Sequence, residues 1–220
     1  MSWVKKYLTR RGIIADNNAA IGIGTLIMFI SMIIVAGVAA SVMIQTMNSL
    51  ENKALEVGQD TIREVSTGLR VLQITGYKND LNISQLGIFV RTLAGSSGVD
   101  LSEAFISISD SSKKVVLDYT SNVFSSSVSG GLFSTINSSN LSSSTYGIIV
   151  IRDYDNSCSV TTPVLNDDDL FVLMVNTTKC FSGISTRSRV TGRVVPEIGM
   201  NGVFSFTTPS AYVDNIIELQ

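Results

Sequence analysis

The chain has 220 residues, of which 45% are hydrophobic and 15% charged, and its formal net charge is −2. This small net charge gives no overall field that would attract nucleic acid. The sequence contains no histidine, which excludes Ser-His-Asp and Cys-His catalysis and removes the commonest transition-metal ligand.

A long apolar segment follows a short basic one at the start of the chain. The basic residues are Lys5, Lys6, Arg10 and Arg11. No charged residue occurs between Asn17 and Leu50, and about 20 apolar residues are enough for a helix to cross a bilayer. The positive-inside rule places the basic residues in the cytoplasm and the chain after the helix outside the cell. A secretory signal is the alternative, but its apolar core spans only about 7–15 residues.

The predicted helix continues beyond the apolar segment. Apolar residues recur at helical spacing from Leu50 to Leu72, with charged residues on the opposite face. Gly76 is a typical helix stop. We therefore expect one helix over residues 20–76, about 80 Å long. Its apolar surface cannot be buried by the helix alone, so this element predicts partners.

Small residues punctuate the apolar helix. Each glycine costs a helix in water about 1 kcal/mol relative to alanine, whereas small residues in an apolar assembly let helices approach closely. Membrane helices also tolerate glycine, so both interpretations stay open. The residues expected to pack between helices are Gly22, Gly24, Leu26, Phe29, Ile33, Gly37, Val38 and Ser41.

Alternating patterns typical of β-strands follow from residue 77 onward. "AFISISD" and "KKVVLDY" predict a hairpin, and the further strands are "YGIIVIRDY", "DLFVLMVNTT", "SRVTGRVVPE" and "NGVFSFTTP". Short strands at this spacing favour an antiparallel β-sandwich, Ig-like or barrel-like. The predicted fold class is α+β, with a β-rich outer domain over residues 77–220. The serine-rich segment 121–145 is expected to be a long surface excursion with room for one short helix.

Two kinds of modification are predicted on the outer domain. Four N-x-[ST] sequons begin at Asn82, Asn137, Asn140 and Asn176. All four follow the predicted membrane helix, so at least one is expected to carry an N-linked glycan. Cys158 and Cys180 do not have the number or spacing of a zinc site. We expect a disulfide between them outside the cell, with two buried thiols as the alternative.

Acidic loops are the only candidate metal ligands in the sequence. "NDDDL" contains Asp167, Asp168 and Asp169, and "RDYDNS" spans residues 152–157. Such oxygens could hold structural calcium or magnesium. The EF-hand spacing is missing, and solvated acidic turns are the favoured interpretation. No other cofactor is predicted.

Two terminal blocks carry a family resemblance. "GIGTLIMFISMIIVAGVAASVMIQT" resembles the N-terminal helix of archaeal flagellins (archaellins), and "RVTGRVVPEIGMNGVFSFTTPSAYVDNIIELQ" is similar to their C-terminal block, with its PE-x-G and F-x-TP elements. The pieces "VIRDYDNS", "PVLNDDDL" and "STRSRVTG" fit the same pattern. The region 77–145 matches only loosely.

This resemblance implies a structural protein rather than an enzyme. The subunit would enter the membrane transiently, lose a leader resembling that of type IV pilins to a prepilin-type peptidase, and be assembled by a membrane motor complex. The product would be a helical homopolymer, with or without paralogous flagellins, forming the extracellular filament used for swimming. Its N-terminal helices would form the filament core and its β-domains the outer sheath.

The resemblance leaves two leader cleavage positions open. A basic pair plus glycine favours cleavage between Gly12 and Ile13. The register of "GIGT" favours cleavage between Ala19 and Ala20, which gives a leader over residues 1–19 and is the preferred position. In that register the early acidic residue of ordinary pilins is missing, which argues against an adhesion pilin. A single-span, membrane-anchored surface binding domain is the other alternative, and a secreted hydrolase is least supported.

Overall fold

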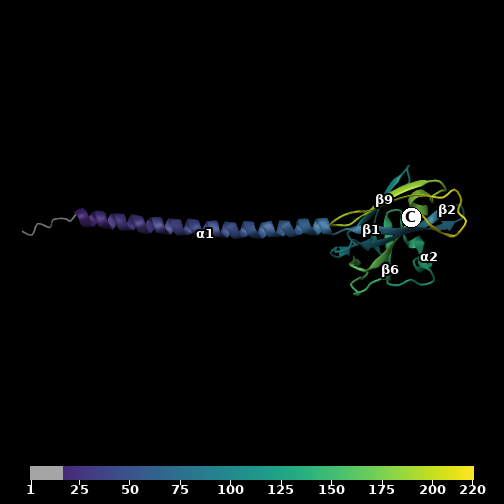
Figure 1. The fold of residues 1–220 in the computed structure, drawn as a ribbon, viewed down its shortest axis with the longest axis horizontal. Coiled ribbons are helices and arrows are strands. Elements are labelled where there is room, and N and C mark those ends of the chain that lie inside the picture. The colour runs from purple at the N-terminus through teal and green to yellow at the C-terminus, as the bar shows by residue number, and fades with distance from the viewer. Residues whose placement is uncertain (1–16) are drawn as a thin grey trace, which may run out of the picture. The chain divides into compact units, whose positions relative to one another are not determined.

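The computed structural model describes residues 17–220. Its contacts divide the chain into two compact units, with the boundary between Val57 and Gly58. One helix, α1 (Asn17–Ser66), makes up the described part of the first unit and enters the second (Figure 1). Every described side chain of α1 from residue 21 onward is exposed.

The helix is shorter than the sequence predicts. It ends at Ser66, and strand β1 (Leu69–Asn79) takes up residues 69–76, which were expected to be helical. A Cβ at Gly68 would lie 2.8 Å from Leu93 Cδ1, so the chain enters the sheet at a crowded point. Residues 71–75 include three β-branched side chains, and β1 pairs with β2 from Leu69 to Asn79. Sheet pairing and burial outweigh the helical spacing here.

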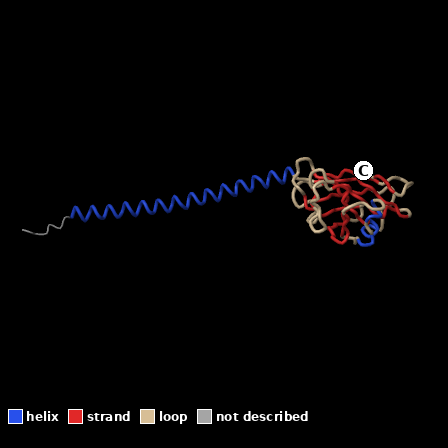
Figure 2. Tube along the Cα trace, turned by 90° about the horizontal axis from the view of Figure 1, so that it is seen from below, coloured by secondary structure: helices blue, strands red, loops and turns tan. Residues whose placement is uncertain are grey.

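Nine strands of the second unit form one curled sheet in the order β10-β9-β4-β5-β6-β8-β2-β1-β11. The strands of this unit are drawn in red in Figure 2. After β1 they are β2 (Asn82–Thr92), β4 (Phe105–Ser109), β5 (Lys114–Ser125), β6 (Thr145–Arg152), β8 (Leu170–Asn176), β9 (Arg189–Val195), β10 (Gly202–Thr207) and β11 (Ile216–Glu218). Two short strands, β3 (Val99–Asp100) and β7 (Val164–Leu165), pair separately. The short helices are α2 (Leu132–Thr135), η1 (Ser138–Asn140) and α3 (Thr177–Phe181).

This sheet confirms the α+β class with a long N-terminal helix, but it differs from the predicted antiparallel sandwich. The strands belong to one mixed sheet, in which β5 and β6 are parallel neighbours. Parallel neighbours need a long crossover connection, and the serine-rich segment between β5 and β6 provides it. The predicted 104–119 hairpin is present as β4 and β5.

The two ends of the sheet approach each other. Leu69 N donates to Met200 O at 3.0 Å, and Ser205 N donates to Gln220 Oε1 at 3.3 Å. The C-terminal residues also pair with β1, where Ile74 N donates to Gln220 O at 3.0 Å. These bonds cover much of the edge that an open sheet would expose.

Two apolar clusters result from this curl. The larger lies inside it and contains the buried Tyr146, Phe171 and Phe204. The smaller covers the other face of β6 and β8, where Phe133, Ile136 and Leu141 pack against them. The scattered apolar residues of the serine-rich segment therefore have a structural role, because they bury a face of the sheet.

Candidate functional site

The most unusual surface of the described chain is the apolar half of α1. Seventeen large apolar side chains between Ile21 and Leu50 are each 50–75% exposed. An 18-residue window of Ile21–Ser66 has a mean hydropathy of 2.6, with none of it buried. Full burial of one such side chain is favourable by about 1.5 kcal/mol or more, so removing all of them from water is favourable by roughly 25 kcal/mol. This surface requires an apolar surrounding.

The glycines of this segment have no explanation within the chain. A Cβ added at Gly22, Gly24 or Gly37 would meet nothing within 4 Å beyond the neighbouring turns of the helix. Along the helix, steps of three and four place several predicted packing residues on one stripe. They are Gly22, Leu26, Phe29, Ile33, Gly37 and Ser41, while Gly24 and Val38 lie off it. The stripe is a narrow face along which another helix can approach closely.

Two threonine hydroxyls in this segment bond to the helix backbone itself. Thr25 Oγ1 donates to Gly22 O at 2.9 Å, and Thr46 Oγ1 donates to Met43 O at 2.8 Å. A hydroxyl satisfied in this way needs no water. These two side chains are therefore compatible both with lipid and with a packed bundle.

The predicted leader cleavage positions fall at the beginning of the described chain. Gly12 and Ile13 lie outside the described residues, and Ala19 and Ala20 lie in the first turns of α1.

The C-terminal PE-x-G block (residues 196–199) contacts the residue that directly follows α1. Met200 N donates to Thr67 O at 2.9 Å, and Thr67 Oγ1 lies 2.8 Å from Ser97 Oγ. Gly199 has φ of 100°, and a Cβ there would lie 2.2 Å from Thr67 O. A side chain is therefore excluded at Gly199, and the block fixes the residue that follows the helix.

The four sequons gather around α3. Lys179 Nζ donates to Ser139 O and Leu141 O at 2.8 and 2.6 Å, which holds η1 beside this helix. On its other side, Thr178 Oγ1 donates to Ser84 O at 3.5 Å. Sequon residues far apart in the sequence thus share one surface.

The acceptor asparagines differ in access. Asn176 is 7% exposed and caps α3, and its Nδ2 donates to Ser138 O at 2.8 Å. Asn82 is half-buried, whereas Asn137 and Asn140 are exposed. Asn137 Oδ1 accepts from Ser139 Oγ and Ser139 N at 2.6 and 3.0 Å, which leaves its amide nitrogen available.

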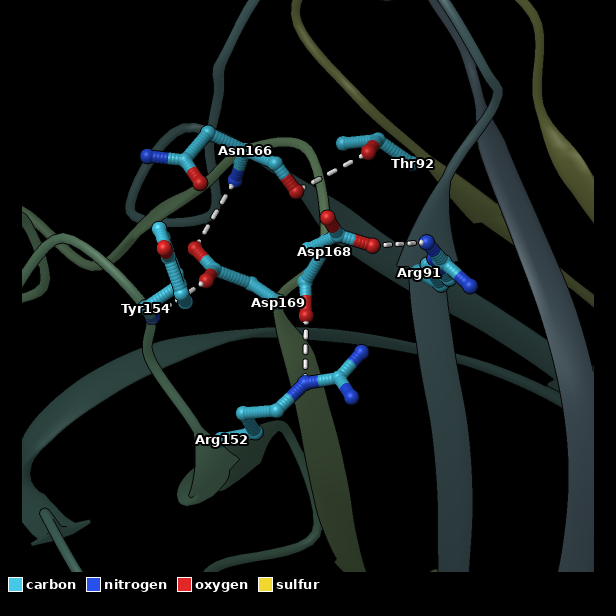
Figure 3. A network of polar contacts seen from close by, with 7 residues as sticks. All are labelled: Arg91, Thr92, Arg152, Tyr154, Asn166, Asp168 and Asp169. Carbon is cyan, nitrogen blue, oxygen red and sulfur yellow. Dashed lines mark hydrogen bonds and ion pairs between the residues drawn. The ribbon is translucent and has the colours of Figure 1, made fainter.

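The acidic loops meet at the start of β8. Carboxylate oxygens of Asp153, Asp155 and Asp169 lie within 4.8 Å of one another. Asp169 is buried and accepts from Tyr154 N and Asn166 N at 2.9 and 3.2 Å (Figure 3). Asp153 Oδ1 is buried with no hydrogen-bond partner, although buried polar atoms are normally paired. The hydrogen bond from the Ser157 hydroxyl lowers the pKa of Asp155, so this carboxylate stays charged.

The predicted acidic triplet is therefore divided. Only Asp169 joins the cluster. Asp168 forms an ion pair with Arg91 at 2.7 Å, and its carbonyl accepts from Arg152 Nε (Figure 3). Asp167 is exposed. The three clustered carboxylates and the unpaired oxygen match the ligands that a hard cation prefers, and Asp153 and Asp155 replace Asp167 and Asp168 in the predicted set.

The expected disulfide is not formed, because Cys158 and Cys180 are free thiols. Cys158 N donates to Asp153 Oδ2 in the loops before β8, whereas Cys180 lies in α3, which follows β8. The seven residues of β8 span roughly 20 Å, and a disulfide requires Cα atoms within about 7 Å. Burial and the nearby carboxylates of Asp153, Asp169 and Asp100 raise the pKa of Cys158 to about 12, so this thiol stays protonated.

Comparison with known proteins gives a consistent result. Residues 19–206 match the family described as archaeal-type flagellin. Flagellin B2 of Methanocaldococcus jannaschii is 42% identical over 207 residues, covering 92% of this chain and 95% of that protein. Flagellin B4 of Pyrococcus abyssi is 40% identical over 217 residues, covering 92% and 99%.

Two solved structures share the fold. The crystal structure of archaeal flagellin FlaB1 from Methanocaldococcus jannaschii has a TM-score of 0.64 and 34% identity, covering 70% of this chain and 97% of that one. The archaeal flagellum of Methanospirillum hungatei also gives a TM-score of 0.64, at 16% identity over 89% and 98% of the two chains. The second likeness concerns the fold alone.

Proposed function

The chain belongs to the archaeal-type flagellin family, whose members are structural proteins rather than enzymes, and from this premise we propose that it polymerises into the extracellular filament of an archaeal flagellum. The observation that carries the proposal is the exposed apolar surface of α1, which needs an apolar surrounding. In the filament that surrounding is other copies of α1. The filament serves swimming motility, as the family relationship implies.

Packing between helices accounts for the glycines. Lipid surrounds a membrane helix as favourably as apolar side chains do, so transfer from bilayer to bundle gains little from apolar contact alone. Close approach of helix backbones at small residues supplies part of the free energy that favours the bundle over the bilayer. A Cβ at Gly22, Gly24 or Gly37 would meet nothing within 4 Å among the described residues, so these positions are open to close approach by another chain.

The proposed route starts in the membrane. The precursor spans the bilayer with its basic leader in the cytoplasm, a prepilin-type peptidase removes the leader, and a membrane motor complex assembles the subunits. The preferred cleavage site between Ala19 and Ala20 is supported by the register of "GIGT" and by the family match, which begins at residue 19.

The outer domain would carry glycans on the exposed sequons. Asn137 and Asn140 are the proposed acceptors because both are exposed. Asn176 is a poor acceptor in the folded domain, since its amide is buried and already donates a hydrogen bond. Structural calcium or magnesium would bind Asp153, Asp155 and Asp169, where the unpaired Asp153 Oδ1 supports a ligand role.

Gly37→Leu tests polymerisation through α1 without disturbing membrane insertion. Leucine is apolar and favours a helix more than glycine does, so the precursor should enter the membrane at the wild-type level, as measured by cell fractionation. The added side chain blocks close helix approach, and electron microscopy of a host lacking its chromosomal copy should show no filaments. Met43→Leu, which nearly conserves volume, is the matched control. Normal filaments from Gly37→Leu would argue against the helix bundle.

A further inference from the structure

A basic hollow lies on one face of β4, β5, β9 and β10. It has a volume of about 460 Å³. Strand register places Lys114 beside Ser109, and Arg193 between Ser107 and Val203. Arg189 lies further along β9, where it pairs with Thr207 of β10. The floor of the hollow therefore includes small hydroxyl side chains beside Gly192, Val203 and Phe204, with cationic groups around it.

These cationic groups have no ion-pair partner among residues 17–220. Lys114, Arg189 and Arg193 are exposed, and in residues 17–220 the ion pair present is the distant one between Arg91 and Asp168. None of the described residues that line the hollow is acidic. A concentration of one sign of charge, in a chain whose net charge is only −2, requires an excess of the opposite sign elsewhere on the molecule.

The acidic loops before β8 provide that excess. The loops hold five carboxylates, Asp153, Asp155 and Asp167 to Asp169, against Arg91 and Arg152, so they stay net negative even with a divalent cation on the Asp153, Asp155 and Asp169 cluster. Asp167 and Asp168, which lie outside that cluster, are exposed. Asp167 has no hydrogen-bond or ion-pair partner among the described residues. These loops adjoin β6, β8 and β2, whereas the hollow lies over β5, β4, β9 and β10. The two surfaces are thus different parts of the domain.

We propose that the basic hollow of one subunit receives the acidic loops of a second copy of the same chain. The inference rests on the proposed filament function and specifies a contact within it. The two surfaces are different, so the contact is heterologous, and a heterologous contact that does not close on itself generates an open helical polymer. The occupant is a second copy because this chain carries both surfaces. Hydroxyl side chains on the floor can donate hydrogen bonds to incoming carboxylates.

Electrostatic contact of this kind fixes the register of neighbouring subunits more than it adds affinity. The helices supply the apolar contact, which does not distinguish one axial position from the next. Two surfaces of opposite charge in the outer domain do distinguish one axial position of a subunit from the next. Salt screens exposed charges over about 8 Å at physiological ionic strength, so filaments held in this way should become less ordered and shorter at 1 M salt.

Charge exchange tests the contact in the full chain. Arg193→Asp and Asp167→Arg are each introduced in the host lacking its own copy, alone and together, and filaments are counted by electron microscopy. Each single change places like charges opposite one another and should lower the number of filaments about tenfold. The double variant restores opposite charges and should recover filaments. Arg187→Glu is the matched control, because Arg187 is an exposed arginine that does not line the hollow.

Recovery in the double variant also excludes misfolding as the cause of the single defects. Single variants that assemble like wild type, or a double variant no better than either single one, would overturn the contact. A defect in the Arg187→Glu control equal to that of Arg193→Asp would overturn it as well. A wild-type chain that forms no filaments in the same host would instead overturn the proposed function, and the contact with it.

Discussion

Replacing Gly199 by alanine should destabilise the outer domain where α1 enters the sheet. Gly199 has φ of 100°, and an added Cβ would lie 2.2 Å from Thr67 O. The same oxygen accepts the hydrogen bond from Met200 N at 2.9 Å. The backbone must therefore move, and the bond that anchors the end of α1 to the β9–β10 connection is lost or lengthened.

The expected loss has two parts. A non-glycine residue in an unfavourable region of φ and ψ costs about 1–3 kcal/mol, and a lost hydrogen bond costs about 1 kcal/mol more. A total of about 2–4 kcal/mol is a large share of the roughly 5–15 kcal/mol that stabilises a typical domain. In a domain of about this size it corresponds to a fall in Tm of about 6–12 °C.

Gly95→Ala is the matched control. Gly95 also has positive φ, at 79°, but a Cβ there meets nothing within 4 Å. It should lose only about 1 kcal/mol, or about 3 °C in Tm. Thermal unfolding of the full chain in detergent, followed by the near-ultraviolet circular dichroism of the tyrosines, measures both. Equal losses in the two variants would refute the argument that the Thr67 contact excludes a side chain.

Four further predictions concern processing, modification, cations and pH. Mass spectrometry of surface filaments should find an N-terminus at Ala20 or Ile13, and an intact Met1 would count against leader removal. Glycopeptide mapping should find sugar on Asn137 or Asn140 and none on Asn176, and Ser139→Ala should remove any sugar from Asn137. A glycan on Asn176 would contradict the argument that burial prevents its modification. Calcium should raise the Tm of the full chain, and EDTA should reverse the increase. Asp153→Asn should abolish this response, whereas Asp167→Asn should keep it. Equal responses in the two variants would exclude this site. The free energy of unfolding should fall as pH rises from 9 to 12. The folded domain holds the pKa of Cys158 and Tyr119 near 12, while their ordinary values are 9.0 and 10.0, so the unfolded chain releases these protons first. Cys158→Ser should make the decline shallower, and an unchanged slope would be the contrary result.

The apolar helix and most strands could be predicted because their patterns are local. Charge is absent over Asn17–Leu50, and the alternation in "AFISISD" or "NGVFSFTTP" repeats every second residue. These patterns report burial in one element at a time, and the structure has a helix or strand at each. The end of α1 was predicted wrongly because Leu69 and Leu72 fit helical spacing, while the decisive partner, β2, lies beyond the next turn.

Features that depend on distant residues could not be predicted in this way. The parallel pairing of β5 with β6 follows from where the serine-rich crossover packs, and that packing is a tertiary property. The cysteines were expected to pair because the domain was placed outside the cell, and the sequence does not reveal that β8 separates their surroundings. Asp153 and Asp155 lie close to Asp169 because two loops that are separate in the sequence meet at one strand end in the fold. The requirement for glycine at position 199 was signalled only by the resemblance of the PE-x-G block.

The central claim is that the apolar half of α1 ends buried among identical helices. Helical reconstruction of filaments sheared from cells by electron cryomicroscopy tests it most directly. The account predicts that Ile21–Leu50 of neighbouring copies pack together along the filament axis, with no lipid between them and the outer domains around them. A filament whose subunits contact one another only through their outer domains, with α1 of each copy in the membrane, would contradict it.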